Sequence, residues 1–266
     1  YNAFGGFLKG KYYFIVGDSA SGKTFLSMTC LAEATINRHF GEYRFIYDNI
    51  EDGGLLDLDR LFSEAVADRV EPPALDREGN PIYSDTIESF YFNLDDALKG
   101  GKPIIYILDS MDALYSEASD KKFEQAKRFH HKASQKDGEK EDKLAGSYGT
   151  DKAKKNSEYI RKALKRLRDT GSILIILSQT RDNIGSMYGG KTRAGGRALR
   201  FYATLEIWSS IVQSLKRTIH EKAREIGVRV CLEIKKNRIT GKRAEVEVDI
   251  YPSFGIDDIG SMVDYL

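Results

Sequence analysis

The chain has 266 residues, and its 41 Lys and Arg residues against 40 Asp and Glu residues leave a net charge of +1. With 41% hydrophobic and 30% charged residues, the composition excludes an intrinsically disordered chain, and a chain of this length buries enough surface to fold without disulfides. The longest aliphatic run, residues 173–177, is far shorter than the ~20 residues that span a bilayer, so we expect no membrane partner.

Two cysteines cannot build a disulfide framework or a zinc site. The first ten residues lack the basic segment and apolar run of a secretory signal. A reducing, cytoplasmic setting is therefore the default expectation.

Apolar runs alternate with helical patterns along most of the chain. Residues 12–16, 44–47, 103–108 and 173–177 are nearly continuous in apolar side chains, which is typical of parallel strands covered on both faces. Apolar residues recur at helical spacing after Lys23 and again before the fourth run. This alternation predicts an α/β fold with a mostly parallel sheet flanked by helices.

The last quarter of the chain has a different pattern. Residues 202–208, 229–235 and 244–251 resemble strands joined by hairpin-type connections. Residues 215–227 fit either a short helix or a hairpin. We therefore expect an antiparallel extension on the C-terminal side of the parallel core.

Residues 117–157 show almost no periodic apolar signal. Their eleven Lys and Arg against eight Asp and Glu residues leave a charge of +3, and glycines and serines are frequent. We interpret this segment as a long, mobile, basic insertion within a single domain that covers residues 1–266.

Residues 17–24 match the phosphate-binding motif G-x-x-x-x-G-K-[ST] at every fixed position, after a strand and before a helix. Gly17 and Gly22 let the backbone curl so that N–H groups point at phosphate oxygens, and the helix adds its positive dipole end. In such motifs the lysine reaches the β- and γ-phosphates and the hydroxyl binds Mg²⁺. The residues expected to bind the nucleotide are Gly17, Asp18, Ser19, Ala20, Ser21, Gly22, Lys23 and Thr24.

Polar residues follow the other apolar runs. Asp109 ends a hydrophobic strand, where it is expected to help Thr24 hold Mg²⁺; alternatively it caps a helix that starts at residue 111. After the second strand, Glu51 is the expected general base, with Asp48 as its rival. Gln179, after the fourth strand, is a candidate sensor of the γ-phosphate.

Several stretches resemble the RecA family of recombination ATPases. Residues 5–10 are similar to the family's glycine lead-in, residues 178–185 to N-Q-x-R-x-x-I-G, residues 195–203 to G-G-x-A-L-K-F-Y-A, and residues 236–238 to K-N-K. The resemblance implies a RecA-like P-loop NTPase core that binds ATP and Mg²⁺. Residues 236–238 and 255–257 also look phage-like, which implies a bacterial or phage-infected cell.

The resemblance also implies contacts with DNA and with other copies of the chain. The family's first DNA-binding loop corresponds to the basic insertion, which either contacts a second strand or duplex DNA or is a functionally neutral surface segment. The family's second DNA-binding loop corresponds to residues 180–196, where cations contact phosphates and apolar side chains lie between bases. The DNA-binding residues implied are Arg181, Met187, Tyr188, Lys191, Arg193, Gly195 and Gly196. Lys236 and Arg238 match cations that reach the nucleotide of a neighbouring subunit, or they are ordinary cations on a sheet edge.

Together these features predict a DNA-dependent ATPase and recombinase. Its copies would form a helical filament on single-stranded DNA, take up duplex DNA and promote strand exchange. Two alternatives stay open: a ring-forming motor of the same fold, such as a hexameric helicase, and a regulatory relative that does not hydrolyse ATP. The regulatory relative is kept because the acid follows its strand here as D-x-x-E, where the family has D-x-E.

Overall fold

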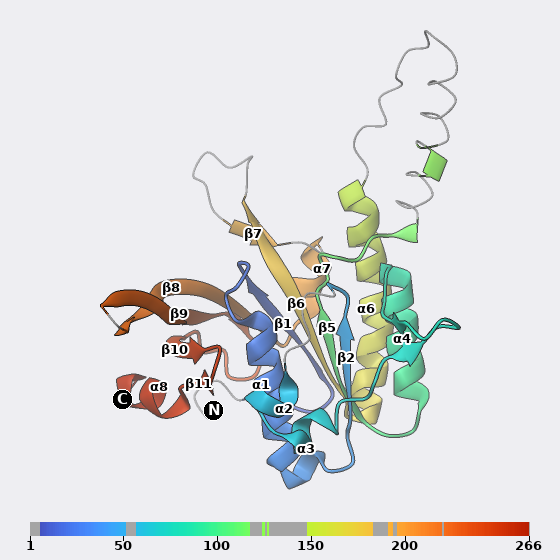
Figure 1. The fold of residues 1–266 in the computed structure, drawn as a ribbon. Coiled ribbons are helices and arrows are strands. Elements are labelled where there is room, and N and C mark those ends of the chain that lie inside the picture. Colours follow the sequence, from blue (N-terminus) through green and yellow to red (C-terminus); the bar gives the residue numbers. More distant parts are fainter. Residues whose placement is uncertain are drawn as a thin grey trace.

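The computed structural model of the chain describes residues 6–51, 57–117, 124, 125, 127, 148–182, 191–193, 196–219 and 221–265. Its centre is a twisted sheet covered by helices on both faces (Figure 1). The strand order is β11-β10-β9-β8-β1-β6-β5-β2, with β7 paired to β6. The pairs among β1, β2, β5, β6 and β8 are parallel, and those of β8 with β9, β9 with β10 and β10 with β11 are antiparallel.

The strands of this sheet are β1 (Lys11–Gly17), β2 (Arg44–Asn49), β5 (Ile104–Asp109), β6 (Ile173–Asp182), β7 (Lys191–Arg193), β8 (Leu205–Ile219), β9 (Lys222–Asn237), β10 (Glu245–Tyr251) and β11 (Gly255–Ile256). A separate two-stranded hairpin consists of β3 (Ala74–Leu75) and β4 (Pro81–Ile82). The expected α/β class, with an antiparallel C-terminal extension, is confirmed.

The helices are α1 (Lys23–Ile36), η1 (Arg38–Phe40), α2 (Leu58–Leu61), α3 (Glu64–Ala67), α4 (Ile87–Lys99), α6 (Tyr148–Thr170), α7 (Gly196–Tyr202) and α8 (Asp258–Tyr265). Helix α4 begins at a capping box, in which Thr86 and Ser89 each bond the other's backbone N–H. Within the described part of the chain, no helix has both the length and the apolar character needed to cross a membrane.

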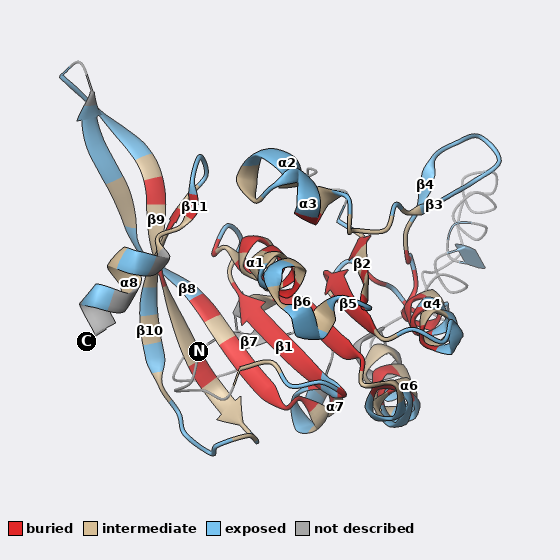
Figure 2. Ribbon diagram, turned by 90° about the horizontal axis from the view of Figure 1, so that it is seen from below, coloured by how far each residue is buried: buried red, intermediate tan, exposed pale blue. Residues whose placement is uncertain are grey.

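The alternating side chains of β1 enter two separate cores. Tyr12, Phe14 and Val16 pack with α4, α6 and α7, whereas Tyr13 and Ile15 pack with α1 and the segment that follows β2. The strands at the centre of the sheet are correspondingly buried along almost their whole length (Figure 2). This double coverage explains why their sequences are continuous in apolar residues.

Several boundaries differ from the sequence-based expectation. Tyr202 ends helix α7, and the strand after it begins only at Leu205. Residues 215–227 belong to a long hairpin of β8 and β9, which excludes the short helix. Helix α6 begins at Tyr148, inside the segment expected to be irregular, while residues 118–123, 126 and 128–147 lie outside the described residues. Residues 111–113 form a turn, so Asp109 does not cap a helix there.

Because both faces of the sheet are covered, truncating a side chain of a central strand should lower the free energy of unfolding. Ile175 on β6 is fully buried, whereas Ile36 at the end of α1 is 80% exposed. We expect Ile175→Ala to lower the free energy of unfolding by about 2–5 kcal/mol, because it removes buried methyl groups and leaves a cavity. Ile36→Ala should change it by less than about 0.5 kcal/mol. Urea unfolding of both variants checks this, and equal losses would contradict the placement of β6 in the core.

Candidate functional site: a phosphate-binding loop and its carboxylates

The loop after β1 is positioned by the neighbouring strands. Gly17 lies level with Gln179 on β6 and with Ser209 on β8. A Cβ atom at Gly17 would lie 2.5 Å from the carbonyl oxygen of Ser209 and 2.5 Å from the Oγ of Ser21, so only glycine fits. The hydroxyl of Ser209 donates to the carbonyl of Ser21 and holds the loop against β8.

The loop curls into the start of helix α1. Gly22 has a φ of 78°, and Ala20 also has a positive φ of 58°. Gly22, the N-cap residue of α1, makes no side-chain cap, so within the described part of the chain the N–H groups of the first turn have no side-chain cap. Ser19 and Ala20 are exposed, and Ser21 is buried beneath them. This arrangement fits a phosphate group.

Lys23 is the buried cation of the loop. Its Nζ donates to the carbonyl of Asp18 at 2.7 Å, and the Oγ of Ser21 donates to the same carbonyl at 2.8 Å. Burial lowers the pKa of Lys23, and the surrounding carboxylates, Asp109 first among them, oppose that shift. An anion bound in the loop would give this buried ammonium group a stronger partner than a carbonyl oxygen.

Asp109 at the end of β5 faces the first turn of α1. Its Oδ2 accepts hydrogen bonds from the Thr24 hydroxyl at 2.6 Å and from the Tyr47 hydroxyl at 3.1 Å. Burial raises the pKa of Asp109, and these hydrogen bonds and the nearby Lys23 oppose that shift. Burial also raises the pKa of Tyr47, whose phenol is therefore a neutral donor at neutral pH.

Glu51 and Gln179 meet beside Asp109. The amide Nε2 of Gln179 donates to the Oε1 of Glu51 at 3.1 Å, and the hydroxyl of Ser110 donates to the same oxygen. Backbone N–H groups of residues 50 and 51 both bond the carbonyl of Asp109. The turn after β2 is therefore tied to the end of β5, and it brings the Glu51 carboxylate to the loop.

Asp48 is placed differently from Glu51. Its side chain is buried and accepts the backbone N–H of Ser84 at 3.0 Å, the hydroxyl of Ser84 at 2.5 Å and the hydroxyl of Tyr106 at 2.7 Å. The bonds from Ser84 hold the segment before α4 against β2, and the bond from Tyr106 comes from the neighbouring β5. Asp48 therefore has a structural role, and the geometry favours Glu51 of the two carboxylates.

The end of β6 joins the phosphate-binding loop to the next segment of the chain. The hydroxyl of Thr180 donates to the carboxylate of Asp18, and the backbone N–H of Gln179 donates to the carboxylate of Asp112 at 2.6 Å. Beyond Thr180, the backbone of residues 180–182 pairs with that of residues 191–193, which places Arg181, Lys191 and Arg193 on a short hairpin. Gly196 begins α7, and Met187, Tyr188 and Gly195 lie outside the described residues.

Lys236 and Arg238 both lie against α7. The Nζ of Lys236 donates to the carbonyls of Arg200 and Phe201 at the C-terminal end of that helix. The guanidinium of Arg238 lies 5.3 Å from the ring centre of Phe201, which is 59% exposed. Arg200 in turn pairs with the buried Glu206 at 3.0 Å.

A groove of about 1150 Å³ opens beside the loop and was not expected from the sequence. It is bounded by Ala20 and Gly22 of the loop, by Phe25 of α1, and by Tyr251 and Phe254 around the turn between β10 and β11. A glycine at position 255, with a φ of 98°, gives this turn its shape. The aromatic residues of the C-terminal segment are the signal that would have located the groove.

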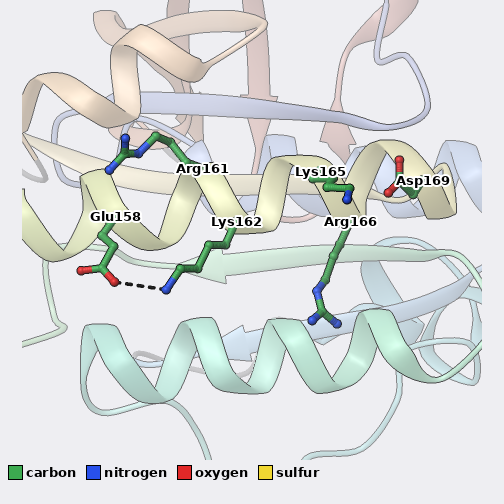
Figure 3. A pocket seen from close by; sticks show the side chains of 6 residues that line it. All are labelled: Glu158, Arg161, Lys162, Lys165, Arg166 and Asp169. Carbon is green, nitrogen blue, oxygen red and sulfur yellow. Dashed lines mark hydrogen bonds and ion pairs between the residues drawn. The ribbon is translucent and has the colours of Figure 1, made fainter.

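Helix α6 carries a band of cations that was likewise not expected. A depression of about 580 Å³ lies along this helix. Figure 3 shows the side chains that line it, which are Glu158, Arg161, Lys162, Lys165, Arg166 and Asp169. Lys162 pairs with Glu158 at 3.1 Å, and Arg166 pairs with Asp95 of α4 at 2.8 Å. Arg161 and Lys165 make no ion pair within the described part of the chain. Their spacing of four residues was the signal available in the sequence.

The burial of Asp109 predicts how stability depends on pH. A carboxyl group whose pKa is raised in the folded protein stabilises the fold below its unfolded pKa, and that contribution is lost as pH rises through the folded pKa. We therefore expect Asp109→Asn to have a higher free energy of unfolding than the wild type at pH 7. The difference should shrink as pH falls below the ordinary carboxyl pKa. Urea unfolding across this pH range measures it, and a difference that grows at low pH would contradict it.

Comparisons with known proteins place the chain in a family context. The model of the RecA N-terminal domain matches residues 132–257. Proteins named RecA from Lactiplantibacillus pentosus and Prochlorococcus marinus (strain MIT 9211) are each 28% identical over 98% of this chain, which covers 59% and 61% of those proteins. RecA of Cytophaga hutchinsonii is 28% identical over 98% of the chain and 63% of its own length.

The chain thus spans about three-fifths of the length of the curated relatives it matches. The stretch that the family model matches contains Gln179, Lys236 and Arg238. The alignments to RecA proteins extend over nearly the whole chain. These findings confirm the resemblance drawn from the motifs: over nearly its whole length, the chain is similar, at 28% identity, to proteins named RecA.

Proposed function

We propose that the protein binds and hydrolyses ATP and forms filaments on single-stranded DNA, as a recombinase of the RecA type. One observation carries the proposal. Side chains from four separate segments, namely Thr24, Glu51, Asp109 and Gln179, converge on one phosphate-binding loop. A merely structural loop does not require two carboxylates and a glutamine at its mouth.

The donor set at the loop fits Mg²⁺. Mg²⁺ is held in nucleotide sites by few protein oxygens together with the substrate's phosphates. The Thr24 hydroxyl and the Asp109 carboxylate would hold the ion, while Lys23 and the N–H groups of the loop bind the phosphates. When bound, Mg²⁺ neutralises charge on the β- and γ-phosphate oxygens.

The groove beside Gly22 extends this site to the nucleoside. It lies next to the phosphate-binding loop and is lined by Phe25, Tyr251 and Phe254. Aromatic faces of this kind stack on a flat base. A nucleoside triphosphate whose phosphates occupy the loop would therefore place its base in this groove.

Glu51 is the proposed general base that takes a proton from the attacking water. Its carboxylate lies at the mouth of the loop, while Asp48 is buried among three hydrogen-bond donors. Gln179 contacts Glu51 and lies one residue before Thr180, where the segment of the proposed DNA loop begins. From this position Gln179 could sense whether the γ-phosphate is present and change the position of the proposed DNA loop accordingly.

Single-stranded DNA is the proposed binding partner. The hairpin of β6 and β7 presents the backbone of residues 181 and 191–193, and the family resemblance assigns their cations to DNA phosphates. The Arg161 and Lys165 side chains of α6 add cations without ion pairs among the described residues. Cations without carboxylate partners are available to phosphate oxygens.

Assembly of several copies is the remaining part of the proposal. Lys236 and Arg238 are proposed to reach the nucleotide of a neighbouring copy, which would make hydrolysis depend on assembly. In the single chain both rest against α7, close to the exposed ring of Phe201. Aromatic and arginine side chains are enriched at protein interfaces.

The role of Glu51 is tested by removing its charge. We expect Glu51→Gln to lower ATP turnover by about 10²- to 10⁴-fold, because it removes a general base, while ATP still binds. Lys23→Ala should abolish binding, because the buried cation for the phosphates is removed. Phosphate release, with and without single-stranded DNA, and nucleotide binding by calorimetry measure both effects.

Glu42→Gln is the matched control, because Glu42 is an exposed carboxylate outside the loop; its turnover should equal that of the wild type. Normal turnover in Glu51→Gln would move the base to another residue. ATP binding without turnover in the wild type would support the non-hydrolysing alternative. Electron microscopy of the same samples distinguishes filaments from rings.

The cations of α6 are tested by the salt dependence of DNA binding. We expect Arg161→Ala and Lys165→Ala to weaken binding, and each should reduce the slope of log affinity against log salt by about one, since each removes one cation from a phosphate. Lys162→Ala is the control, because Lys162 is already paired with Glu158. Fluorescence anisotropy with labelled single-stranded DNA measures the slopes. An effect of Lys162→Ala as large as that of Arg161→Ala would exclude a specific interaction.

A further inference from the structure

Two hydrogen bonds from side-chain hydroxyls connect the ends of β2 and β5 at the mouth of the loop. Tyr47 on β2 donates to Asp109 at the end of β5, and Ser110 after β5 donates to Glu51 after β2. Each carboxylate of the site is thus held by a hydroxyl from the neighbouring strand. Neither hydroxyl belongs to a motif that the sequence reveals.

Tyr47 is held firmly enough to orient its partner. Its ring is half-buried and packs against the core formed with α1. The parallel register of β2 and β5 sets Asn49 opposite Asp109. The backbone of Tyr47 therefore lies two residues before Asp109 along the sheet, and the long tyrosine side chain spans that distance to the carboxylate. The Oδ2 of Asp109 then receives both the Tyr47 hydroxyl and the Thr24 hydroxyl.

We infer that Tyr47 is a positioning residue for the Mg²⁺ site, whose hydroxyl fixes the orientation of the Asp109 carboxylate. This inference rests on the proposed binding of Mg²⁺ and ATP. A carboxylate at the end of a strand can rotate about its terminal bond, and a second donor removes that freedom. The Tyr47 hydroxyl provides a donor that belongs to the sheet and not to the phosphate-binding loop.

The geometry also separates Tyr47 from the groups that bind phosphate. Its hydroxyl bonds the Asp109 carboxylate, whereas the Lys23 ammonium group and the Ser21 hydroxyl bond the carbonyl of Asp18 within the loop. Removal of the Tyr47 hydroxyl should therefore affect the metal requirement of nucleotide binding and leave the affinity for nucleotide alone unchanged.

Tyr47→Phe is the appropriate variant, because it keeps the packed ring and removes only the hydroxyl. We expect the Mg²⁺ concentration for half-maximal binding of a fluorescent ATP analogue to rise by about tenfold, the lower end of the effect of removing a partner of a metal ligand. Binding measured in EDTA should not change. Thermal unfolding of the same sample verifies that the variant is folded.

Tyr43→Phe is the matched control. The Tyr43 hydroxyl donates to the carbonyl of Gly171 at 2.9 Å, away from the carboxylates, so this variant loses a hydrogen bond of the same kind. Its Mg²⁺ midpoint should equal that of the wild type. As a second measurement, fluorotyrosine incorporated at position 47 should show a change in its fluorine NMR signal when Mg²⁺ is added to nucleotide-bound protein, and the same label at position 43 should not.

The inference is overturned if Tyr47→Phe keeps the wild-type midpoint, if both variants shift equally, or if Tyr47→Phe loses the same factor in EDTA. These results leave the proposed function standing, since the wild type still binds Mg²⁺ and ATP. A wild-type protein that binds no ATP, with or without Mg²⁺, would overturn both proposals together.

Discussion

The parallel pairing of β1 with strands on both of its sides is the constraint on which the site depends. Because β1 lies between β6 and β8, the residue at its end is level with Gln179 on one side and Ser209 on the other. The chain can leave the sheet there only through a residue without a side chain, which Gly17 supplies. The phosphate-binding loop therefore starts at a fixed point relative to the ends of its neighbours, as ligand sites do in open parallel sheets.

The second organising feature is the pairing of hydroxyls with carboxylates at the ends of β2 and β5. Thr24, Tyr47, Ser84, Tyr106 and Ser110 all donate to one of three carboxylates. Two of these hydroxyls satisfy Asp48 in the interior, which stabilises the fold. The other three bond Asp109 and Glu51 at the mouth of the loop. The same type of interaction thus holds a buried carboxylate in the interior and the two carboxylates of the proposed site.

Much of this arrangement could be predicted from sequence, because it depends on local patterns. The phosphate-binding motif defines its own loop, and continuous apolar runs identify buried strands such as β5 and β6. The long hairpin of β8 and β9 was ambiguous, because residues 215–227 mix charged and apolar side chains without a clear period. The start of α6 at Tyr148 was missed, since residues 148–157 are polar and helical spacing of apolar residues begins only near Ile160.

Spacing alone leaves Asp48 as a rival of Glu51, since both residues lie at the end of one strand. The contacts that separate the two carboxylates come from Ser84 and Tyr106, which are distant in sequence and approach Asp48 only in the folded chain. The same applies to Tyr47, because its hydroxyl donates a hydrogen bond to Asp109, which lies on another strand. Tertiary contacts of this kind have no local signature.

Asp18 has a consequence for how the molecule can move. Its carbonyl accepts the Lys23 ammonium group inside the loop, and its carboxylate accepts the Thr180 hydroxyl on β6. One residue therefore faces two segments that are distant from each other in the chain. A shift of either segment strains the bond to the other, so movements of the loop and of β6 are joined mechanically through this single residue.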